Sequence, residues 1–231
     1  LGAIDYAIHG GIKPARIIVT DIDQARLDRA QKLISVESAQ QQGIELIYVN
    51  TKDLPDPVAT LRELNGGELF DDVFVFAPVK SLVEMADALL GKDGCLNFFA
   101  GPTDPKFSAN FNFYNVHYES HHLVGTSGGN TEDIKESLEM MSRGLLHPEA
   151  MITHVGGLNA VAETTINLDK IPGGKKLIYT HKKLDLVAIA DFAERGKTDP
   201  FYAELARITE AHNGLWCKEA EDYLLQHAPE I

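Results

Sequence analysis

The stretch that most constrains the fold of this chain runs from Arg16 to Asp28, RIIVTDIDQARLD. Its residues 17–20 are mostly β-branched and predict a short strand buried on both faces. This strand ends at an acid, Asp21, and a helix follows almost at once. In a doubly wound α/β sheet, a carboxylate at the C-terminal end of the second strand can bind both hydroxyls of an adenosine ribose and repel a 2′-phosphate. A competing interpretation is that Asp21 or Asp23 only caps the following helix.

Strand and helix patterns alternate along the chain after this stretch. Strands are predicted over residues 16–21, 44–49, 72–77, 95–100 and 122–126, and helices over residues 24–41, 57–64, 81–90 and 131–143. The caps expected for the last two helices are Ser81 and Thr131. This alternation is typical of βαβ units and predicts an α/β fold with a Rossmann-like, doubly wound parallel sheet.

The remaining residues predict an appendage to this sheet. Short strands are expected over residues 151–155 and 176–179 with a helix over 158–167 between them, and amphipathic helices over 185–195, 201–212 and 215–227. We therefore predict a dinucleotide-binding domain over residues 1–180 and a helical C-terminal extension over residues 181–231.

The beginning of the chain predicts that a strand precedes it. Residues 1–10 (LGAIDYAIHG) already have the pattern of a helix ended by Gly10 and Gly11. A helix that leads directly into the strand 16–21 implies an earlier strand and a tight turn, which in a dinucleotide-binding fold carries the GxGxxG loop. No such loop occurs in the chain. We expect it upstream of Leu1, so that the sheet lacks its first strand, which would carry two ladders.

Composition excludes several classes of partner. The formal net charge is −13, and an acidic surface repels both nucleic acid and anionic membranes, so neither is expected as a partner. Cys95 and Cys217 lie far apart and form no zinc-binding spacing, which favours a reducing, cytoplasmic setting. Cys95 is expected in the core of a strand and Cys217 on a packed helix.

Four segments resemble the cofactor domain and C-terminal part of the medium-chain dehydrogenase/reductase family, the zinc-type alcohol and polyol dehydrogenases. They are AIDYAIHGGIKPARIIVTDID (3–23), FFAGP (98–102), HLVGTSGGNTEDI (122–134) and GGKKLIY (173–179). The long helical tail is similar to that of the polyol-phosphate branch. The resemblance implies NAD as cofactor, a polyol or sugar-phosphate substrate, hydride transfer between a polyol and a ketose, and a homodimer or homotetramer.

The same resemblance implies roles for individual residues. Asp21 would bind the adenosine ribose with Arg26 beside it, and the other implied cofactor-binding residues are Ala77, Pro78, Ala100, Gly101, Pro102, Thr126, Ser127 and Lys175. The family places its zinc ligands, Cys, His and Glu, in an amino-terminal domain that this chain lacks. No catalytic or metal-binding residue is therefore assigned within the chain, zinc is expected outside it, and the chain alone is expected to be inactive.

Three alternatives stay open at this point. A strand through His117, Glu119 and His121 would place these side chains on one face as metal ligands, although an exposed edge where two copies join their sheets explains them as well. An S-adenosylmethionine-dependent methyltransferase also binds a ribose with an acid after its second strand. A Rossmann-like module without catalytic activity, used for assembly, would bind no nucleotide.

Overall fold

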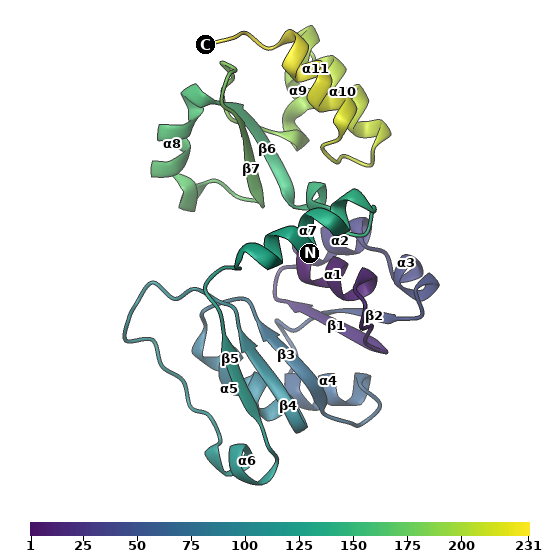
Figure 1. Ribbon diagram of the computed structural model, residues 1–231, viewed down its shortest axis with the longest axis vertical. Helices are drawn as coiled ribbons and strands as arrows, with labels where there is room; N and C mark the ends of the chain where they lie inside the picture. Colours follow the sequence, from purple (N-terminus) through teal and green to yellow (C-terminus); the bar gives the residue numbers. More distant parts are fainter. The chain divides into compact units, whose positions relative to one another are not determined.

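The computed structural model describes residues 1–231 and divides into two compact units. We call residues 12–139 the central unit, and residues 1–11 together with residues 140–231 the terminal unit. Each unit has its own strands and helices (Figure 1). The predicted domain boundary at residue 180 falls inside the terminal unit, where β6 (Ile152–Gly157) and β8 (Val187–Ala188) pair across it. The functional division at residue 180 stays a prediction.

The central unit begins with a parallel pair of strands, β1 (Arg16–Asp21) and β2 (Glu45–Asn50). Helices α2 (Gln24–Leu33) and α3 (Val36–Gln41) connect them, where one helix over residues 24–41 was predicted. The helix breaks because the Ser35 side chain accepts a hydrogen bond from the Ser38 N–H and so starts a new helix. The side chains of β1 are half-buried, and that of Thr20 is exposed, so the strand is not fully buried as predicted.

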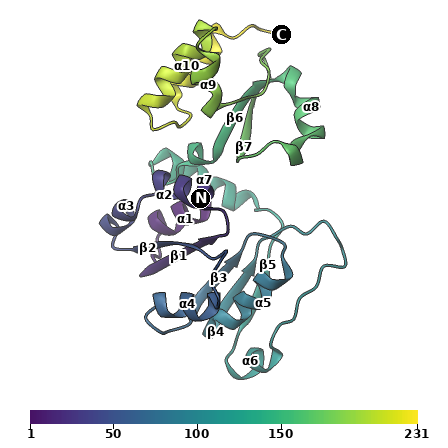
Figure 2. The ribbon, with the colours of Figure 1, turned by 180° about the vertical axis from the view of Figure 1, so that it is seen from behind.

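The second sheet of the central unit contains β3 (Phe70–Val75), β4 (Leu90–Phe98) and β5 (His122–Gly125), all parallel. Helices α4 (Pro57–Leu64) and α5 (Lys80–Leu89) cover one of its faces (Figure 2). The core between α5 and the sheet contains Val75, Val83, Ala86, Leu90 and Leu96. Strand order and direction confirm the predicted α/β class with parallel strands.

One feature separates this fold from a continuous doubly wound sheet. The strands form two sheets, β1–β2 and β3–β4–β5, and no ladder joins β1 to β3. A doubly wound sheet of this strand order places its first strand between these two, hydrogen-bonded on both sides. The break between the two sheets lies at that position.

Two further predictions for the central unit are wrong. Residues His117 and Tyr118 belong to a short helix, α6 (Phe113–Tyr118), so His117, Glu119 and His121 do not share the face of a strand. The predicted caps are also displaced. The helix α5 begins at Lys80 without a side-chain cap, and Asn130, rather than Thr131, accepts hydrogen bonds from the first N–H groups of α7 (Thr131–Ser142).

The terminal unit combines helix α1 (Gly2–His9) with a second small sheet. Strands β7 (Lys175–Tyr179) and β8 flank β6, parallel and antiparallel respectively. Helix α8 (Val161–Ile166) lies on one side of this sheet, while α9 (Phe192–Arg195), α10 (Pro200–Ala211) and α11 (Lys218–His227) gather on the other (Figures 1 and 2). The tail is therefore packed on strands β6–β8 and forms one core with them.

Both cysteines are half-buried, and Trp216 of the tail is buried. Cys95 is half-buried on β4, less buried than the predicted core position, and burial raises the pKa of its thiol. Cys217 is half-buried and precedes α11. Trp216 is buried in the terminal core, and its Nε1 donates a hydrogen bond of 2.9 Å to the Tyr179 hydroxyl.

Candidate functional site

The carboxyl ends of β3, β4 and β5 lie side by side in the central unit. Val75, Phe98 and Gly125 are neighbours in register across these three strands. Parallel strands bring the segments that follow them to one edge of a sheet, which is where open α/β sheets bind their ligands. This edge brings together three groups of predicted residues, namely Ala77 with Pro78, Ala100 with Gly101 and Pro102, and Thr126 with Ser127.

The segment after β4 presents an open stretch of backbone. The N–H groups of Phe99 and Ala100 both donate to the Val75 carbonyl, at 3.1 and 3.0 Å, which ties the segment to the end of β3. Ala100 is buried, whereas Gly101 and Pro102 are exposed. A Cβ built on Gly101 would meet no protein atom within 4 Å. The space beside Gly101 is therefore free for a ligand that approaches the backbone closely.

A hydrogen bond from one of its own side chains stabilises the turn after β5. The Thr126 hydroxyl donates a hydrogen bond of 2.8 Å to the Gly128 carbonyl, and Gly128 has a φ of +82°, which favours glycine. Ser127 between them is exposed. At the end of β5, a Cβ on Gly125 would lie 3.3 Å from the Phe98 carbonyl oxygen, so the backbones of β4 and β5 approach closely there. The turn thus exposes Ser127 at the sheet edge.

Asp21 and Asp23 have different partners at the end of β1. Asp23 caps α2 and accepts from the N–H groups of Ala25 and Arg26, and the hydrogen bond from Arg26 lowers the pKa of its carboxyl group. Asp21 accepts one hydrogen bond, from the Asp23 N–H to Oδ1 at 2.9 Å. Its Oδ2 lies 3.5 Å from Arg26 Nη1. Because Asp23 is the cap, the capping interpretation does not account for Asp21.

Asn50 is a neighbour of Asp21 that the sequence reasoning missed. It pairs with Asp21 in register at the end of β2, and its Nδ2 donates to Gln24 Oε1 at 3.0 Å. Its Oδ1 accepts the Lys52 N–H at 3.0 Å. A polar residue at the end of the next predicted strand was the available signal. The edge of β1–β2 therefore carries a carboxylate and a carboxamide side by side.

Lys175 begins β7 in the terminal unit and is exposed. Its neighbour Lys176 points its Nζ at backbone carbonyls, including that of Gly174 at 2.8 Å. The contact of Lys175 with a pyrophosphate, which the resemblance implied, stays a prediction.

The residues present fit parts of an adenine dinucleotide. The carboxylate of Asp21 has one oxygen free of backbone donors and suits the two hydroxyls of a ribose. The exposed small residues after β4 and β5 suit the flat nicotinamide end, but no glycine-rich pyrophosphate loop occurs in the chain. The Cys, His and Glu set expected for a catalytic zinc is not brought together either. The group of potential metal ligands that the structure does assemble is Asp5, His9 and His147.

Known proteins are similar to this chain over most of its length. The profile of the family described as "Zinc-binding dehydrogenase" matches residues 1–143. The chain is 60% identical over 225 residues to protein YggP of Escherichia coli K12, 58% identical over 226 residues to mannitol-1-phosphate 5-dehydrogenase of Aliivibrio fischeri, and 45% identical over 231 residues to L-sorbose 1-phosphate reductase of Klebsiella pneumoniae. These matches cover 97, 98 and 99% of this chain.

The chain spans about half the length of these curated relatives, 53, 53 and 52% respectively. Among solved structures, 2R,3R-butanediol dehydrogenase of Bacillus subtilis matches with a TM-score of 0.58 and 17% identity, over 75% of this chain and 46% of that one. This match supports the fold, a Rossmann-type α/β arrangement.

Proposed function

The chain belongs to the zinc-binding dehydrogenase family, and we propose that it is the cofactor-binding portion of an NAD-dependent oxidoreductase that interconverts a polyol, or polyol phosphate, and a ketose. The observation that carries the proposal is Asp21, a carboxylate at the end of a parallel strand that does not cap the next helix. The substrate class is supported by relatives that are named as acting on mannitol 1-phosphate and L-sorbose 1-phosphate.

Each part of the sheet edge has a separate task in this proposal. Asp21 accepts hydrogen bonds from the 2′- and 3′-hydroxyls of the adenosine ribose and disfavours a 2′-phosphate by charge repulsion. Ala77 and Pro78 line the adenine side. The exposed backbone at Gly101 lets the nicotinamide ring approach, and Thr126 and Ser127 face its carboxamide. When bound, the nicotinamide accepts or donates the hydride.

The catalytic zinc of the proposed enzyme would be held by residues outside this chain, where it would polarise a carbonyl or alcohol oxygen. We expect the chain by itself to be inactive for that reason. The proposal includes a homodimer or homotetramer and a cytoplasmic location, the latter supported by two unpaired, widely separated cysteines. No helix of the structure has the length and apolar character needed to cross a membrane.

The alternatives gain no support from the comparisons. The family profile and the relatives with assigned activities are dehydrogenases or reductases, which does not support the methyltransferase interpretation. An assembly module without nucleotide binding would not need the open edge beside Gly101.

The test is a titration of NADH and NADPH into the full-length enzyme, followed by fluorescence or calorimetry. We expect saturable NADH binding and a Kd for NADPH at least about 10-fold higher, since the 2′-phosphate would meet a carboxylate. Tighter binding of NADPH would overturn the role of Asp21. Binding of neither nucleotide would favour the assembly module, and S-adenosylmethionine serves as the control ligand.

A further inference from the structure

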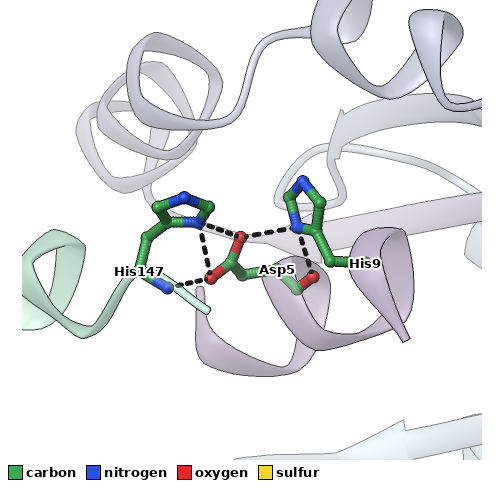
Figure 3. Close-up of side chains that lie close together, drawn as sticks. All are labelled: Asp5, His9 and His147. Carbon is green, nitrogen blue, oxygen red and sulfur yellow. Dashed lines mark hydrogen bonds and ion pairs between the residues drawn. The ribbon is translucent and has the colours of Figure 1, made fainter. Parts of the chain in front are cut away.

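A carboxylate and two imidazoles converge in the terminal unit, apart from every residue assigned to the nucleotide. Asp5 and His9 lie one helical turn apart on α1, and His147 precedes the short helix η1 (Pro148–Met151) (Figure 3). Asp5 Oδ1 lies 3.0 Å from His147 Nδ1 and 3.1 Å from His9 Nδ1. The three potential ligand atoms all lie within 4.8 Å of one another.

The carboxylate of the cluster is buried and is held in place by a backbone hydrogen bond. Asp5 is 5% exposed, while the side chains of His9 and His147 are 22 and 42% exposed. Asp5 Oδ2 accepts the backbone N–H of His147 at 2.6 Å, which fixes the plane of the carboxylate. The cluster is thus buried at the carboxylate and open to solvent at His147, so water could complete a coordination shell there.

The carboxylate of the cluster would attract a cation. A carboxylate between two neutral imidazoles carries a net charge of −1, and burying such a charge is costly unless it is paired. In the structure each ring lies at hydrogen-bond distance from Asp5 Oδ1 through its Nδ1, and His9 Nδ1 also lies 3.0 Å from the Asp5 backbone carbonyl. A divalent ion bound to both Nδ1 atoms, with the proton of each neutral ring on Nε2, would offset the carboxylate and leave the site with a net charge of +1.

Two of the three separations between ligand atoms are close to what tetrahedral zinc requires. Zinc binds imidazole nitrogen and carboxylate oxygen at about 2.0–2.2 Å, so neighbouring ligand atoms lie about 3.4 Å apart. The two nitrogen-to-oxygen separations of 3.0 and 3.1 Å need only a small opening to reach this value. Two nitrogens and one oxygen are a ligand set that suits Zn²⁺ better than Mg²⁺ or Ca²⁺, which prefer oxygen.

We propose that Asp5, His9 and His147 bind one Zn²⁺ ion that fastens α1 to the segment leading into β6. The ligands on α1 and His147 are separated by more than 130 residues, and the only covalent path between them runs through the whole central unit. An ion held by both would stabilise the terminal unit by mass action. This site uses none of the residues that the proposed function assigns to the cofactor or the catalytic zinc.

Its test is a titration of Zn²⁺ into the chelator-treated 231-residue chain, with Co²⁺ as the spectroscopic probe. The catalytic zinc of the proposed enzyme needs residues outside this chain, so it does not contribute to this titration. We expect one saturable Zn²⁺ site per chain and a visible Co²⁺ band of low-coordinate nitrogen and oxygen ligation. Zinc at roughly 100 times its Kd should raise Tm by about 5 °C.

Variants locate the site. His147→Gln and His9→Gln should each weaken Zn²⁺ binding by about 100-fold or more. Substituting a residue that only hydrogen-bonds to a metal ligand already lowers metal affinity by about 10–100-fold. Both positions retain some exposure, so these variants avoid the buried Asp5. The matched control is His122→Gln, which removes an exposed histidine whose Nε2 lies 2.9 Å from Asp93 Oδ1 without a third ligand. It should bind Zn²⁺ as the unaltered chain does.

Three outcomes would overturn the proposal. The first is that a chain shown to be folded by circular dichroism binds no Zn²⁺ saturably. The three residues would then form a hydrogen-bonded cluster that does not bind metal. The second is binding that His9→Gln and His147→Gln leave unchanged. The third is an equal loss in His122→Gln, which would show adventitious binding to surface histidines.

Discussion

Asp23 donates its backbone N–H to the carboxylate of Asp21, at 2.9 Å, while its own carboxylate caps α2. The two acids at the end of β1 thus have separate tasks. The capping contacts are made by Asp23, and the hydrogen bond from its backbone orients Asp21 Oδ1 and leaves Oδ2 without a backbone donor. This arrangement is the basis for the first prediction.

Asp21→Asn in the full-length enzyme should weaken NADH binding by about 10-fold and narrow or reverse the preference over NADPH, because the charge that binds the ribose and repels a 2′-phosphate is lost. The matched control is Asp23→Asn, which keeps a good capping side chain and should leave both Kd values unchanged. Equal effects of the two substitutions would contradict the separate roles. Titration of each variant with NADH and with NADPH measures the four Kd values.

Gly101→Ala should raise the Kd for NADH by about 10-fold with little change in Tm. The added methyl group meets no protein atom within 4 Å, so the protein tolerates it while the cofactor loses its close approach to the backbone. Gly11→Ala is the control, since its Cβ also meets nothing within 4 Å. Unchanged NADH affinity in Gly101→Ala would place the nicotinamide elsewhere.

Tyr179→Phe should lower the free energy of unfolding of the terminal unit by about 1–3 kcal/mol. It removes the hydroxyl that accepts the indole N–H of Trp216, which is 4% exposed, and a buried donor without a partner is costly. The control is Tyr223→Phe, whose ring stacks on Phe201 with centroids 5.7 Å apart and loses only a hydroxyl. Urea unfolding followed by tryptophan fluorescence measures the free energy of unfolding of both variants. Equal losses in Tyr179→Phe and Tyr223→Phe would contradict the prediction.

The stability of the terminal unit should fall as the pH drops below about 6.5, in part because of His154. Burial, together with nearby Lys176 and against the opposing effect of Asp191, lowers the pKa of His154 from its usual 6.5. The unfolded chain therefore binds the proton first, and stability present above pH 6.5 is lost as the pH falls toward the folded pKa. Urea unfolding at pH 7.5 and 5.5 should show a smaller loss for His154→Gln than for the unaltered chain or for His122→Gln. An identical loss of stability in His154→Gln, His122→Gln and the unaltered chain would contradict this prediction.

Local signals in the sequence were sufficient for most elements. The strand over residues 16–21 and the helix over residues 57–64 lie where the pattern placed them, because a β-branched run ending at an acid and a proline after Asp56 fix these boundaries. The end of the helix near residue 33 was missed, because the Ser35 cap competes with a continuous helical pattern. A strand through His117, Glu119 and His121 was one interpretation, but residues 113–118 form a helix capped by Asn112.

The sequence by itself determined that the chain is an α/β protein of parallel strands and that Asp21 ends the strand over residues 16–21, because these follow from the order of short-range patterns. Only the tertiary structure decided that Asp23 rather than Asp21 caps α2, that the sheet breaks between β1 and β3, and that His147 meets Asp5 and His9. These depend on contacts between residues far apart in the chain or on competition between adjacent donors and acceptors. Although the spacing of Asp5 and His9 was visible as one helical turn, no periodicity could indicate a third partner 138 positions beyond His9.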